Sequence, residues 1–288
     1  MEIILKDVSF AYQIAGQQLP VLHNIELKVA PGDLLAITGA GGSGKSTLGQ
    51  LLAGLLEPTA GKVYLNGIPC QARGRSKGVS LWQRVGMVYQ QPEQQLFAET
   101  VFDDVAFGPR NLGLSLPTIK DRVERALQAV GLNPAEIGQR SPFNLSGGQQ
   151  RRVAIAGVLA MEPEVLILDE PTAGLDPAGR AQILSYIRSF FQQRDKAAVL
   201  ISHNMAEVAG LANQVIVLYQ GRIALKGTPR EIFQQGESLR AYRLLPPELP
   251  RLMLELRRLG APVSTDVLTL AEARSAILKW LRGEASGF

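Results

Sequence analysis

The sequence is poor in the residues that build disulfides and metal clusters. Its 288 residues include one cysteine, Cys70, and two histidines, His23 and His203. A single cysteine excludes an internal disulfide and a cysteine-based metal cluster, and it fits a reducing cytosol. We interpret His23 as a structural residue, whereas the interpretation of His203 depends on the motifs described below.

Long hydrophobic runs are also missing. No stretch approaches the roughly 18 uninterrupted apolar residues that a membrane-spanning helix needs. The first residues, Met1–Ile4, lack the basic stretch and the long apolar run of a signal peptide. If the protein works at a membrane, we therefore expect a partner to supply the membrane-spanning segments.

Charge of one sign is only slightly in excess. The net charge is +4, and clustered arginines occur only at Arg151–Arg152 and Arg257–Arg258. A nucleic-acid-binding surface usually gathers basic residues and interleaves them with aromatics, so this pattern gives little support to nucleic-acid binding. A small basic excess is equally compatible with an anionic membrane surface.

The hydrophobic pattern predicts an α/β fold. Apolar residues make up 46% of the sequence, enough for a sizeable core, and the length suits about two domains. The helical stretch Pro177–Phe191 lies between continuous apolar runs, which are typical of buried parallel strands. Strands are expected at Ile3–Phe10, Ile25–Val29, Leu34–Thr38, Lys62–Leu65, Val85–Tyr89, Val165–Leu168 and Ala198–Ile201. Helices are expected at Thr47–Leu56 and over most of residues 91–160, with breaks at Gly108–Pro109 and near Pro142.

The C-terminal part of the sequence changes its pattern near Thr228–Pro229. Leucines from Leu249 to Leu259 mark one short amphipathic helix, and a capping box at Thr269–Glu272 opens another that carries Trp280. Residues 236–288 therefore read as a small helical appendage. Its apolar faces need a partner, which is either the appendage's own core or a second chain.

A glycine-rich stretch after the expected strand Leu34–Thr38 fits the phosphate-loop pattern. Its residues are Gly39, Ala40, Gly41, Gly42, Ser43, Gly44, Lys45 and Ser46. Glycines let backbone N–H groups turn toward phosphates, Lys45 adds a positive charge, and the Ser46 hydroxyl can ligate Mg²⁺. A chance glycine-rich turn is the alternative, but a strand before it and an amphipathic helix after it favour a nucleotide site.

Two carboxylates, Asp169 and Glu170, follow the apolar run Val165–Leu168. Such a strand delivers them to the carboxyl edge of the sheet, where ligands bind in open α/β folds. Asp169 can take part in the Mg²⁺ shell, and Glu170 can orient and deprotonate a water. Alone, the pair could equally begin a solvated loop, and the phosphate loop is what favours the catalytic interpretation.

A third motif is the start of a helix, formed by Ser146, Gly147, Gly148 and Gln149 after Leu145. Ser146 can cap this helix, Gln149 completes a capping box, and the glycines permit a close approach of the backbone. Such a helix start can bind an anion. It can equally be an ordinary helix start, and general physics leaves both interpretations open.

Together these motifs make residues 1–235 resemble the ATP-binding cassette ATPases. The resemblance implies a P-loop NTPase core with an antiparallel β subdomain and a helical subdomain at about 91–160, which binds ATP and Mg²⁺. Nucleotide contacts are implied for Tyr12, Gly39, Ala40, Gly41, Gly42, Ser43, Gly44, Lys45, Ser46, Thr47, Gln90, Ser146, Gly147, Gly148 and Gln149. Magnesium contacts are implied for Ser46, Gln90 and Asp169, and catalytic roles for Glu170 and His203. The stretch Ile14–Leu19 reads as a polar loop with no role that the resemblance assigns.

The resemblance also implies a role for several of these residues. Tyr12 is similar to the aromatic that stacks on adenine, although a strand aromatic in the core is the alternative. Gln90 is similar to the glutamine that senses Mg²⁺ and the attacking water, and His203 to the histidine that contacts the γ-phosphate. Residues Ser146–Gln149 resemble the signature that grips ATP held by another subunit. Residues Ala173–Asp176 resemble the loop exchanged across a dimer of two cassettes.

A narrower resemblance is to the ATPase subunits of energy-coupling factor transporters, which include cobalt and nickel importers. It is carried by Gln91–Phe97, Asp104–Leu114, Arg151–Met161 and Pro247–Pro250. It implies a peripheral subunit on the cytoplasmic face of the cell membrane that drives uptake of a vitamin or a transition-metal ion. The implied partners are an integral-membrane coupling subunit, a substrate-capturing membrane subunit and a second ATPase subunit, identical or related, which the appendage is predicted to help bind. Leu96 and Phe97 are predicted to line the groove for the membrane partner, with burial in the helical subdomain as the alternative.

Two other functions use the same cassette, namely a DNA- or ribosome-associated ATPase and a non-catalytic structural protein. The stretch between Lys45 and Leu145 is too short for the long coiled coil of chromosome-maintenance ATPases, and the chain has a single cassette. Intact Glu170 and His203 disfavour the non-catalytic alternative. We therefore expect an ATPase that drives transport and binds no nucleic acid.

Overall fold

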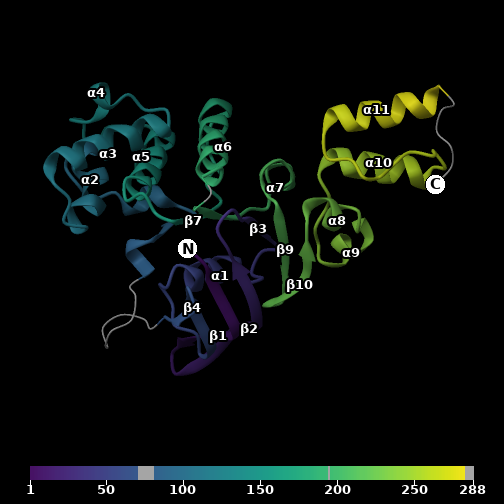
Figure 1. Ribbon diagram of the computed structural model, residues 1–288, viewed down its shortest axis with the longest axis horizontal. Helices are drawn as coiled ribbons and strands as arrows, with labels where there is room; N and C mark the ends of the chain where they lie inside the picture. Colours follow the sequence, from purple (N-terminus) through teal and green to yellow (C-terminus); the bar gives the residue numbers. More distant parts are fainter. Residues whose placement is uncertain (71–80, 194, 283–288) are drawn as a thin grey trace. The chain divides into compact units, whose positions relative to one another are not determined.

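The computed structural model describes residues 1–70, 81–193 and 195–282 (Figure 1). The chain forms two compact units. The first unit contains Met1–Asp33 and Ser46–Ile201, and the second contains Leu34–Lys45 and Ser202–Phe288. Among the described residues, every helix falls short of the length and apolarity that a crossing of the membrane requires.

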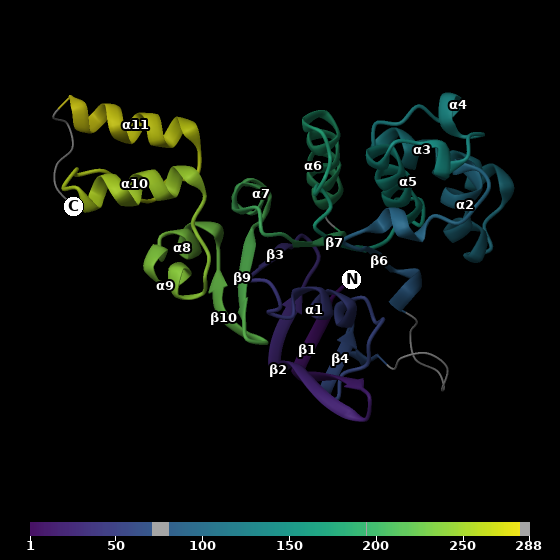
Figure 2. The same cartoon turned by 180° about the vertical axis from the view of Figure 1, so that it is seen from behind.

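The N-terminal part of the first unit is an antiparallel sheet with the order β2-β1-β4-β5 (Figure 2). Its strands are β1 (Ile3–Ile14), β2 (Gln17–Val29), β4 (Ala60–Leu65) and β5 (Ile68–Pro69). The expected polar loop at Ile14–Leu19 was wrong, since Ile14 pairs with Gln17 across a two-residue turn. Both turn residues have positive φ, 49° at Ala15 and 80° at Gly16, which is the geometry that joins two twisted strands directly.

Three parallel strands with the order β8-β7-β6 form the second sheet portion of this unit. They are β6 (Val85–Val88), β7 (Val165–Asp169) and β8 (Ala197–Ile201), with α6 (Pro177–Phe191) between the last two. Every residue of these strands is buried, which explains their continuous apolar runs.

Helix α1 (Lys45–Leu52) is shorter than the expected helix Thr47–Leu56. It begins at the phosphate loop and ends before Gly54, whose φ of +70° is incompatible with a continuing helix. Leu55 lies beyond the helix and is 44% exposed. The predicted helix was too long because the leucine spacing continues past Gly54, and the spacing alone does not reveal that this glycine ends the helix.

The helical subdomain contains α2 (Val101–Asn111), α3 (Leu116–Ala129), α4 (Pro134–Ile137) and α5 (Gly147–Leu159). The expected break at Gly108–Pro109 was wrong, because α2 continues through both residues. Pro109 removes only its own N–H from the helix, and Leu112 still donates to the Gly108 carbonyl at 3.1 Å. A Cβ on Gly108 would lie 2.6 Å from Met161, so this glycine permits close packing. The break near Pro142 was confirmed as a 3-10 turn at Pro142–Asn144.

The second unit contains strands with the order β10-β9-β3, in which β3 and β9 are parallel and β9 and β10 antiparallel. They are β3 (Leu34–Thr38), β9 (Gln214–Tyr219) and β10 (Arg222–Gly227). Helix α7 (Met205–Leu211) precedes β9 in the chain, and helices α8 (Pro229–Phe233) and α9 (Gly236–Ala241) follow β10. Phe233, Leu239 and Leu244 share one hydrophobic cluster with residues of β9, so these helices pack beside that strand.

The last two helices, α10 (Glu248–Arg258) and α11 (Leu270–Leu281), have a core of their own (Figure 1). Met253 and Ala273 are buried in it, and Leu249, Leu256 and Trp280 pack against it. These two leucines and the tryptophan therefore have a partner within the chain. The capping box at Thr269 and Glu272 is confirmed, and residues 283–288 of the expected appendage lie outside the described residues.

Candidate active site

The phosphate loop, Gly39–Lys45, has a backbone that only glycine can adopt at its first position. Gly39 has φ +155°, and a Cβ there would lie 2.2 Å from the carbonyl oxygen of Leu218. Gly42 and Gly44 also have positive φ, 74° and 100°. The Lys45 Nζ donates to the carbonyl oxygens of Gly39 at 2.8 Å and Ala40 at 3.0 Å, which holds the ammonium over the loop.

The buried hydroxyl of Ser43 in this loop tests whether the loop fits a phosphate. Ser43 is 5% exposed, and among the described residues its Oγ is the one buried side-chain polar atom without a hydrogen-bond partner. A buried polar atom without a partner is costly, and an incoming acceptor oxygen would satisfy it. Together with the Lys45 ammonium and the glycine backbone, this hydroxyl fits the oxygens of a nucleotide polyphosphate.

Tyr12, at the end of β1, lies beside the start of α1 within the first unit. Its hydroxyl is 3.2 Å from the Thr47 Oγ1, and its ring meets that of Phe10 edge to face at 4.8 Å. The ring is only partly buried. The structure therefore brings two of the predicted nucleotide residues together and leaves part of the tyrosine ring accessible for stacking.

Three predicted polar residues lie at one sheet edge. Val88 of β6 pairs in parallel with Leu168 of β7, so Gln90 and the carboxylates of Asp169 and Glu170 follow neighbouring strand ends. Asp169 is 4% exposed and Glu170 is 8% exposed. Both carboxylates are therefore buried where the sequence places them, at the carboxyl end of β7.

Glu170 has an unusual backbone. Its φ is +51°, in the left-handed region that non-glycine residues adopt at a cost of about 1–2 kcal/mol. Its N–H donates to the Ile201 carbonyl oxygen at 2.9 Å, which extends the pairing of β7 and β8 by one residue. The strand pairing and the left-handed turn together set the direction in which the carboxylate leaves the sheet.

Arg151 is the site residue whose role the sequence did not reveal. The sequence presented Arg151–Arg152 as a basic cluster, but Arg151 is buried and its Nη2 donates to the carbonyl oxygens of Gln90 at 2.8 Å and Glu170 at 2.6 Å. Burial lowers the pKa of Arg151, whereas the nearby Glu93 and Glu170 raise it. Arg152 donates to the Gly131 carbonyl oxygen at 3.2 Å. Arg151 lies two residues after the signature, which was a signal for a role at the site, but composition alone does not separate a buried arginine from an exposed one.

The signature residues form the start of α5 as expected. The Gln149 N–H donates to the Ser146 Oγ at 3.3 Å, and the Ser146 N–H donates to the Gln149 Oε1 at 3.1 Å, which confirms the capping box. Ser146 and Gly147 are exposed. A Cβ on Gly147 or Gly148 would meet no atom within 4 Å, so the surface of this helix start is open to a ligand from outside.

The remaining predicted residues lie in the second unit and in the loop before α6. His203 follows Ser202 and is exposed. The loop around it is held by Ser202, whose hydroxyl donates to Glu207 at 3.3 Å and accepts from the Asn204 N–H at 3.0 Å. In the first unit, Asp176 caps α6 by accepting from the Gly179 N–H at 2.7 Å.

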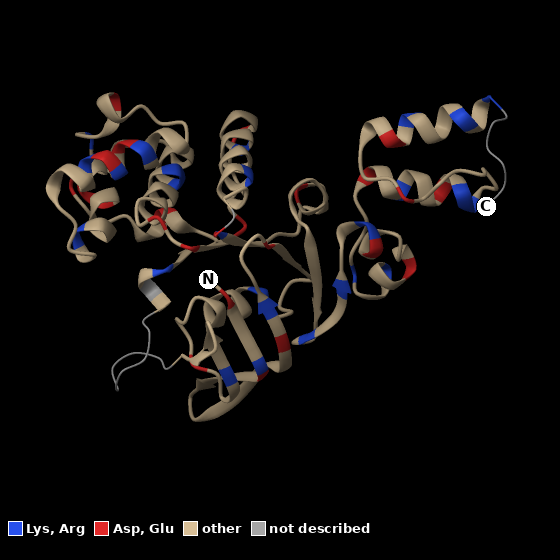
Figure 3. Ribbon diagram, viewed as in Figure 1, with Lys and Arg blue, Asp and Glu red and all other residues tan. Residues whose placement is uncertain are grey.

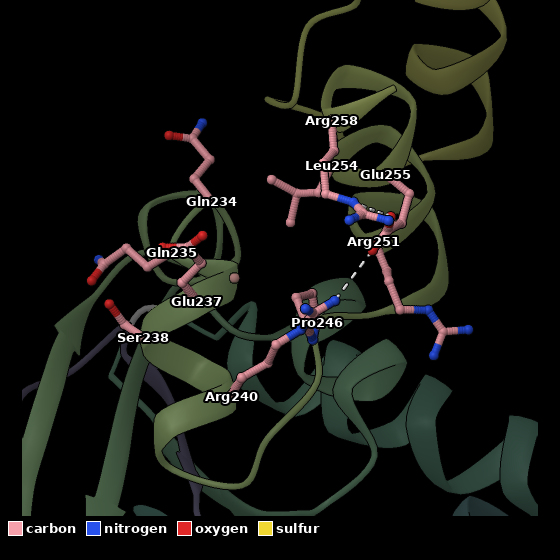
Figure 4. A pocket seen from close by; sticks show the side chains of 11 residues that line it. Gln234, Gln235, Glu237, Ser238, Arg240, Pro246, Arg251, Leu254, Glu255 and Arg258 are labelled. Atoms are coloured by element: carbon pink, nitrogen blue, oxygen red, sulfur yellow. Dashed lines mark hydrogen bonds and ion pairs between the residues drawn. The ribbon is translucent and has the colours of Figure 1, made fainter. Parts of the chain in front are cut away.

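No group of three or more His, Cys, Asp or Glu residues that could hold a metal ion occurs within the described ranges. A separate pocket of about 440 Å³ lies between α9 and α10 (Figure 4). It is lined by the ion-paired Arg240, Glu255 and Arg258 and contains none of the predicted nucleotide residues.

A model of the ABC transporter family matches residues 22–173. The chain belongs to the ABC transporter family. It is 48% identical to the energy-coupling factor transporter ATP-binding protein EcfA2 of Caldanaerobacter subterraneus subsp. tengcongensis, over 98% of this chain and 99% of that relative. The protein of the same name from Bacillus subtilis is 43% identical over 91% of this chain and 96% of its own length.

Solved ABC cassettes have the same fold as this chain. The cbiO1 protein of Clostridium perfringens, described as part of the ABC transporter complex cbiONQ, has a TM-score of 0.70 and 34% identity, covering 90% of this chain and 96% of its own. A dimeric ATP-binding cassette bound to ADP and Pi also has a TM-score of 0.70, with 27% identity, covering 79% of this chain and 99% of its own. The expected ABC fold, the energy-coupling factor resemblance and the ATPase function in transport are thus confirmed.

The helical subdomain of this ABC ATPase exposes two aromatic rings. Phe97 and Phe107 are 59% and 49% exposed, and their rings meet edge to face at 4.9 Å. Leu96 is buried, so the expectation that both Leu96 and Phe97 face a groove was wrong for Leu96. The N–H groups of Phe97 and Ala98 both donate to the Asp104 carboxylate at 2.9 Å, which fixes this segment to α2.

Acidic and basic residues are mixed on the helical subdomain (Figure 3). Arg122 and Arg125 form ion pairs with Glu162 at 2.7 and 3.0 Å, and Arg110 pairs with Asp103 at 2.7 Å. These basic side chains are therefore neutralised within the chain.

Proposed function

We propose that this chain is the ATP-hydrolysing subunit of an energy-coupling factor importer for a vitamin or a transition-metal ion. The observation that carries the proposal is the phosphate loop, where the buried Ser43 hydroxyl lacks a partner among the described residues and Lys45 lies over a glycine backbone. The name shared by the relatives supports the transporter class. The narrower statements on residue roles and partners are what the resemblance to energy-coupling factor ATPases implies.

Within the proposed reaction, Lys45 neutralises the β- and γ-phosphates, and Tyr12 stacks on the adenine. Ser46, Gln90 and Asp169 hold the Mg²⁺ ion or its water ligands, and the ion supplies neutralisation of the phosphate oxygens. Glu170 orients the attacking water and accepts its proton. His203 donates a hydrogen bond to the γ-phosphate from its loop in the second unit.

A second ATPase subunit, identical or related, completes the proposed site. The open helix start at Ser146–Gln149 contacts ATP bound by that subunit, because Ser146 and Gly147 are exposed and the glycines leave the surface there open. The dimeric cassette with ADP and Pi supports this arrangement by its fold. Because ATP would contact both ATPase subunits, ATP binding closes the dimer, and hydrolysis, which removes the γ-phosphate, lets it reopen.

The proposed membrane partners are a coupling subunit and a substrate-capturing subunit, with this chain peripheral on the cytoplasmic face of the cell membrane. Phe97 and Phe107 offer an exposed apolar pair that a helix of the coupling subunit can cover. They lie seven and seventeen residues after Gln90, so a shift at the nucleotide has a short route to this contact.

The decisive test is reconstitution of the transporter in vesicles. We would co-purify this chain with its membrane subunits, identify the substrate-capturing subunit, and measure uptake of its substrate with ATP on the outside. Uptake that requires ATP and disappears with Glu170→Gln is the expected result. A chain that hydrolyses ATP but recovers no membrane subunit would contradict the importer assignment.

A further inference from the structure

Arg151 is a buried cation one turn into α5. It is 7% exposed, although arginine is among the residues that are rarely buried unless they are paired. A buried guanidinium needs hydrogen-bond acceptors, because the loss of its hydration is costly. The groups that accept hydrogen bonds from Arg151 therefore indicate the role of this residue.

These acceptors belong to the segments around two predicted site residues. The Arg151 Nη2 donates to the carbonyl oxygens of Gln90 at 2.8 Å and Glu170 at 2.6 Å. Its Nε lies 3.5 Å from the Pro171 carbonyl oxygen, and its Nη1 lies 3.5 Å from the Glu93 carboxylate. One planar side chain thus joins α5 to the ends of β6 and β7.

Arg151 binds Glu170 at a residue whose backbone conformation is energetically unfavourable. Glu170 has a left-handed φ of +51°, and such a conformation persists only when its surroundings hold it in place. Its carbonyl oxygen accepts from Arg151 and also from the Ala173 N–H at 3.2 Å. Loss of the guanidinium would leave this peptide with weaker support and allow the carboxylate to turn.

We propose that Arg151 is a positioning residue for ATP hydrolysis, whose guanidinium holds the backbones of Glu170 and Gln90 in the geometry that the reaction needs. The inference rests on the proposed role of Glu170 as the base. Arg151 contacts neither water nor nucleotide in this role, and it acts through the direction of the Glu170 carboxylate. A displacement of about 1 Å at a reacting group can reduce a rate by about 100-fold. Loss of the hydrogen bonds from Arg151 to the Glu170 backbone should therefore lower turnover.

Arg122 on α3 provides a control. Its guanidinium also binds a backbone carbonyl, that of Met161 at 3.2 Å, and pairs with the Glu162 carboxylate at 2.7 Å, and both partners follow the end of α5 and are not predicted site residues. Arg151→Gln and Arg122→Gln remove the same charge and the same number of donors. A difference in turnover between the two variants therefore shows that the groups bound by Arg151 matter, and not the loss of a positive charge.

The experiment measures kcat and KM for ATP in the full chain with its partner ATPase, together with the thermal midpoint of each variant. For Arg151→Gln we expect kcat to fall about 10- to 100-fold with KM changed less than about threefold, and Arg151→Lys should retain part of kcat. Arg122→Gln should keep kcat within about twofold. Wild-type kcat in a folded Arg151→Gln chain would overturn the proposal.

A double-mutant cycle separates positioning from general damage to the fold. In the Glu170→Gln background the base is already absent, so adding Arg151→Gln should lower the residual turnover by less than about threefold. Full additivity of the two losses would overturn the proposal, whereas a normal rate for Glu170→Gln alone would overturn the assignment of the base. If neither Arg151 variant folds, Glu93→Gln decides, because it removes one anchor of the guanidinium. A lowered kcat with unchanged KM supports the proposal, and an unchanged kcat overturns it.

Discussion

The Lys45 ammonium donates to the carbonyl oxygen of Gly39 at 2.8 Å, so the phosphate-binding cation lies over its own loop. The same nitrogen donates to the Ala40 carbonyl oxygen at 3.0 Å. These bonds hold the long side chain near the position where phosphates bind and reduce the entropy that the ligand must remove. Nucleotide binding then replaces two neutral acceptors with charged ones, which bind an ammonium more strongly.

Lys45→Ala should therefore weaken nucleotide binding itself. Hydrogen bonds to charged groups contribute about 1.5–3 kcal/mol, so we expect affinity for ATP to fall roughly 10- to 100-fold. Titration calorimetry on the purified chain measures this change. Lys62→Ala, a substitution in the exposed part of β4, serves as the control, and an equal loss in both variants would refute the role of Lys45.

Glu170→Gln should bind ATP normally and lose almost all turnover. The amide has nearly the same shape but cannot accept the proton of the water, and positioned general bases contribute about 10²–10⁴-fold. Phosphate release and ATP affinity should be measured on the same preparation. Glu124→Gln on the exposed face of α3 is the matched control. A Glu170→Gln rate near that of the wild type would sink the assignment of the base.

Phe97→Ala should leave ATP binding intact and weaken assembly with the membrane subunit. Phe97 is 59% exposed, and truncating a good apolar anchor costs about 2 kcal/mol or more, which corresponds to roughly 30-fold in affinity. Phe107→Ala should have a similar effect because the two rings are in contact. Phe143, 60% exposed but outside this pair, supplies the control Phe143→Ala. Full recovery of the complex with normal uptake for Phe97→Ala would exclude the contact.

The exposed leucines of the C-terminal helices should promote association of ATPase subunits. Leu259, Leu270 and Leu281 are 77%, 72% and 67% exposed, unlike Leu249 and Leu256, which pack within the chain. Burial of one leucine contributes about 1.5–3 kcal/mol, so replacing all three with serine should weaken association at least tenfold. Sedimentation without nucleotide measures this, with Leu116→Ser on α3 as the control. Association as strong as in the wild type would show that this appendage does not dimerise.

A truncation that tests the same point should begin after Leu245 rather than at residue 236. Leu239 and Leu244 share a cluster with Phe233 and residues of β9, so removing them would damage the second unit itself. Deletion from residue 246 removes only α10, α11 and the segments around them. We expect this shorter deletion to weaken pairing while nucleotide affinity stays within about twofold, because no phosphate-loop residue packs on those helices.

Acid should loosen the attachment of α11 through Glu272. The Leu268 N–H, the Arg230 guanidinium and the Thr269 N–H lower the pKa of Glu272 from 4.5 to about 2. Because the pKa is depressed in the folded chain, the stabilisation is present above pH 4.5 and is lost as the pH falls toward 2. Trp280 emission in a Trp82→Phe background should follow this loss. Glu272→Gln should lose this pH-dependent change in emission, whereas the control Glu248→Gln should keep it. Identical acid profiles in the parent protein and both variants would disprove the role of Glu272.

The local motifs were predictable because they depend on neighbouring residues. The phosphate loop, the capping boxes at Ser146 and Thr269, and the buried strand before Asp169 are all patterns within a few positions of the chain. Helix ends were less predictable. The leucine pattern extended α1 past Gly54, and Gly108–Pro109 suggested a break although α2 continues through both residues.

The sequence by itself identified the family and the nucleotide-binding motifs, because each rests on local spacing and residue type, but it did not predict β9 and β10. Only the tertiary structure decided which of several residues of the same chemical type are buried. It buried Arg151 on the carbonyls of Gln90 and Glu170, and it separated buried Leu96 from exposed Phe97. The physical reason is that burial and hydrogen-bond partners depend on segments far apart in the chain, whereas a motif depends on its own few residues.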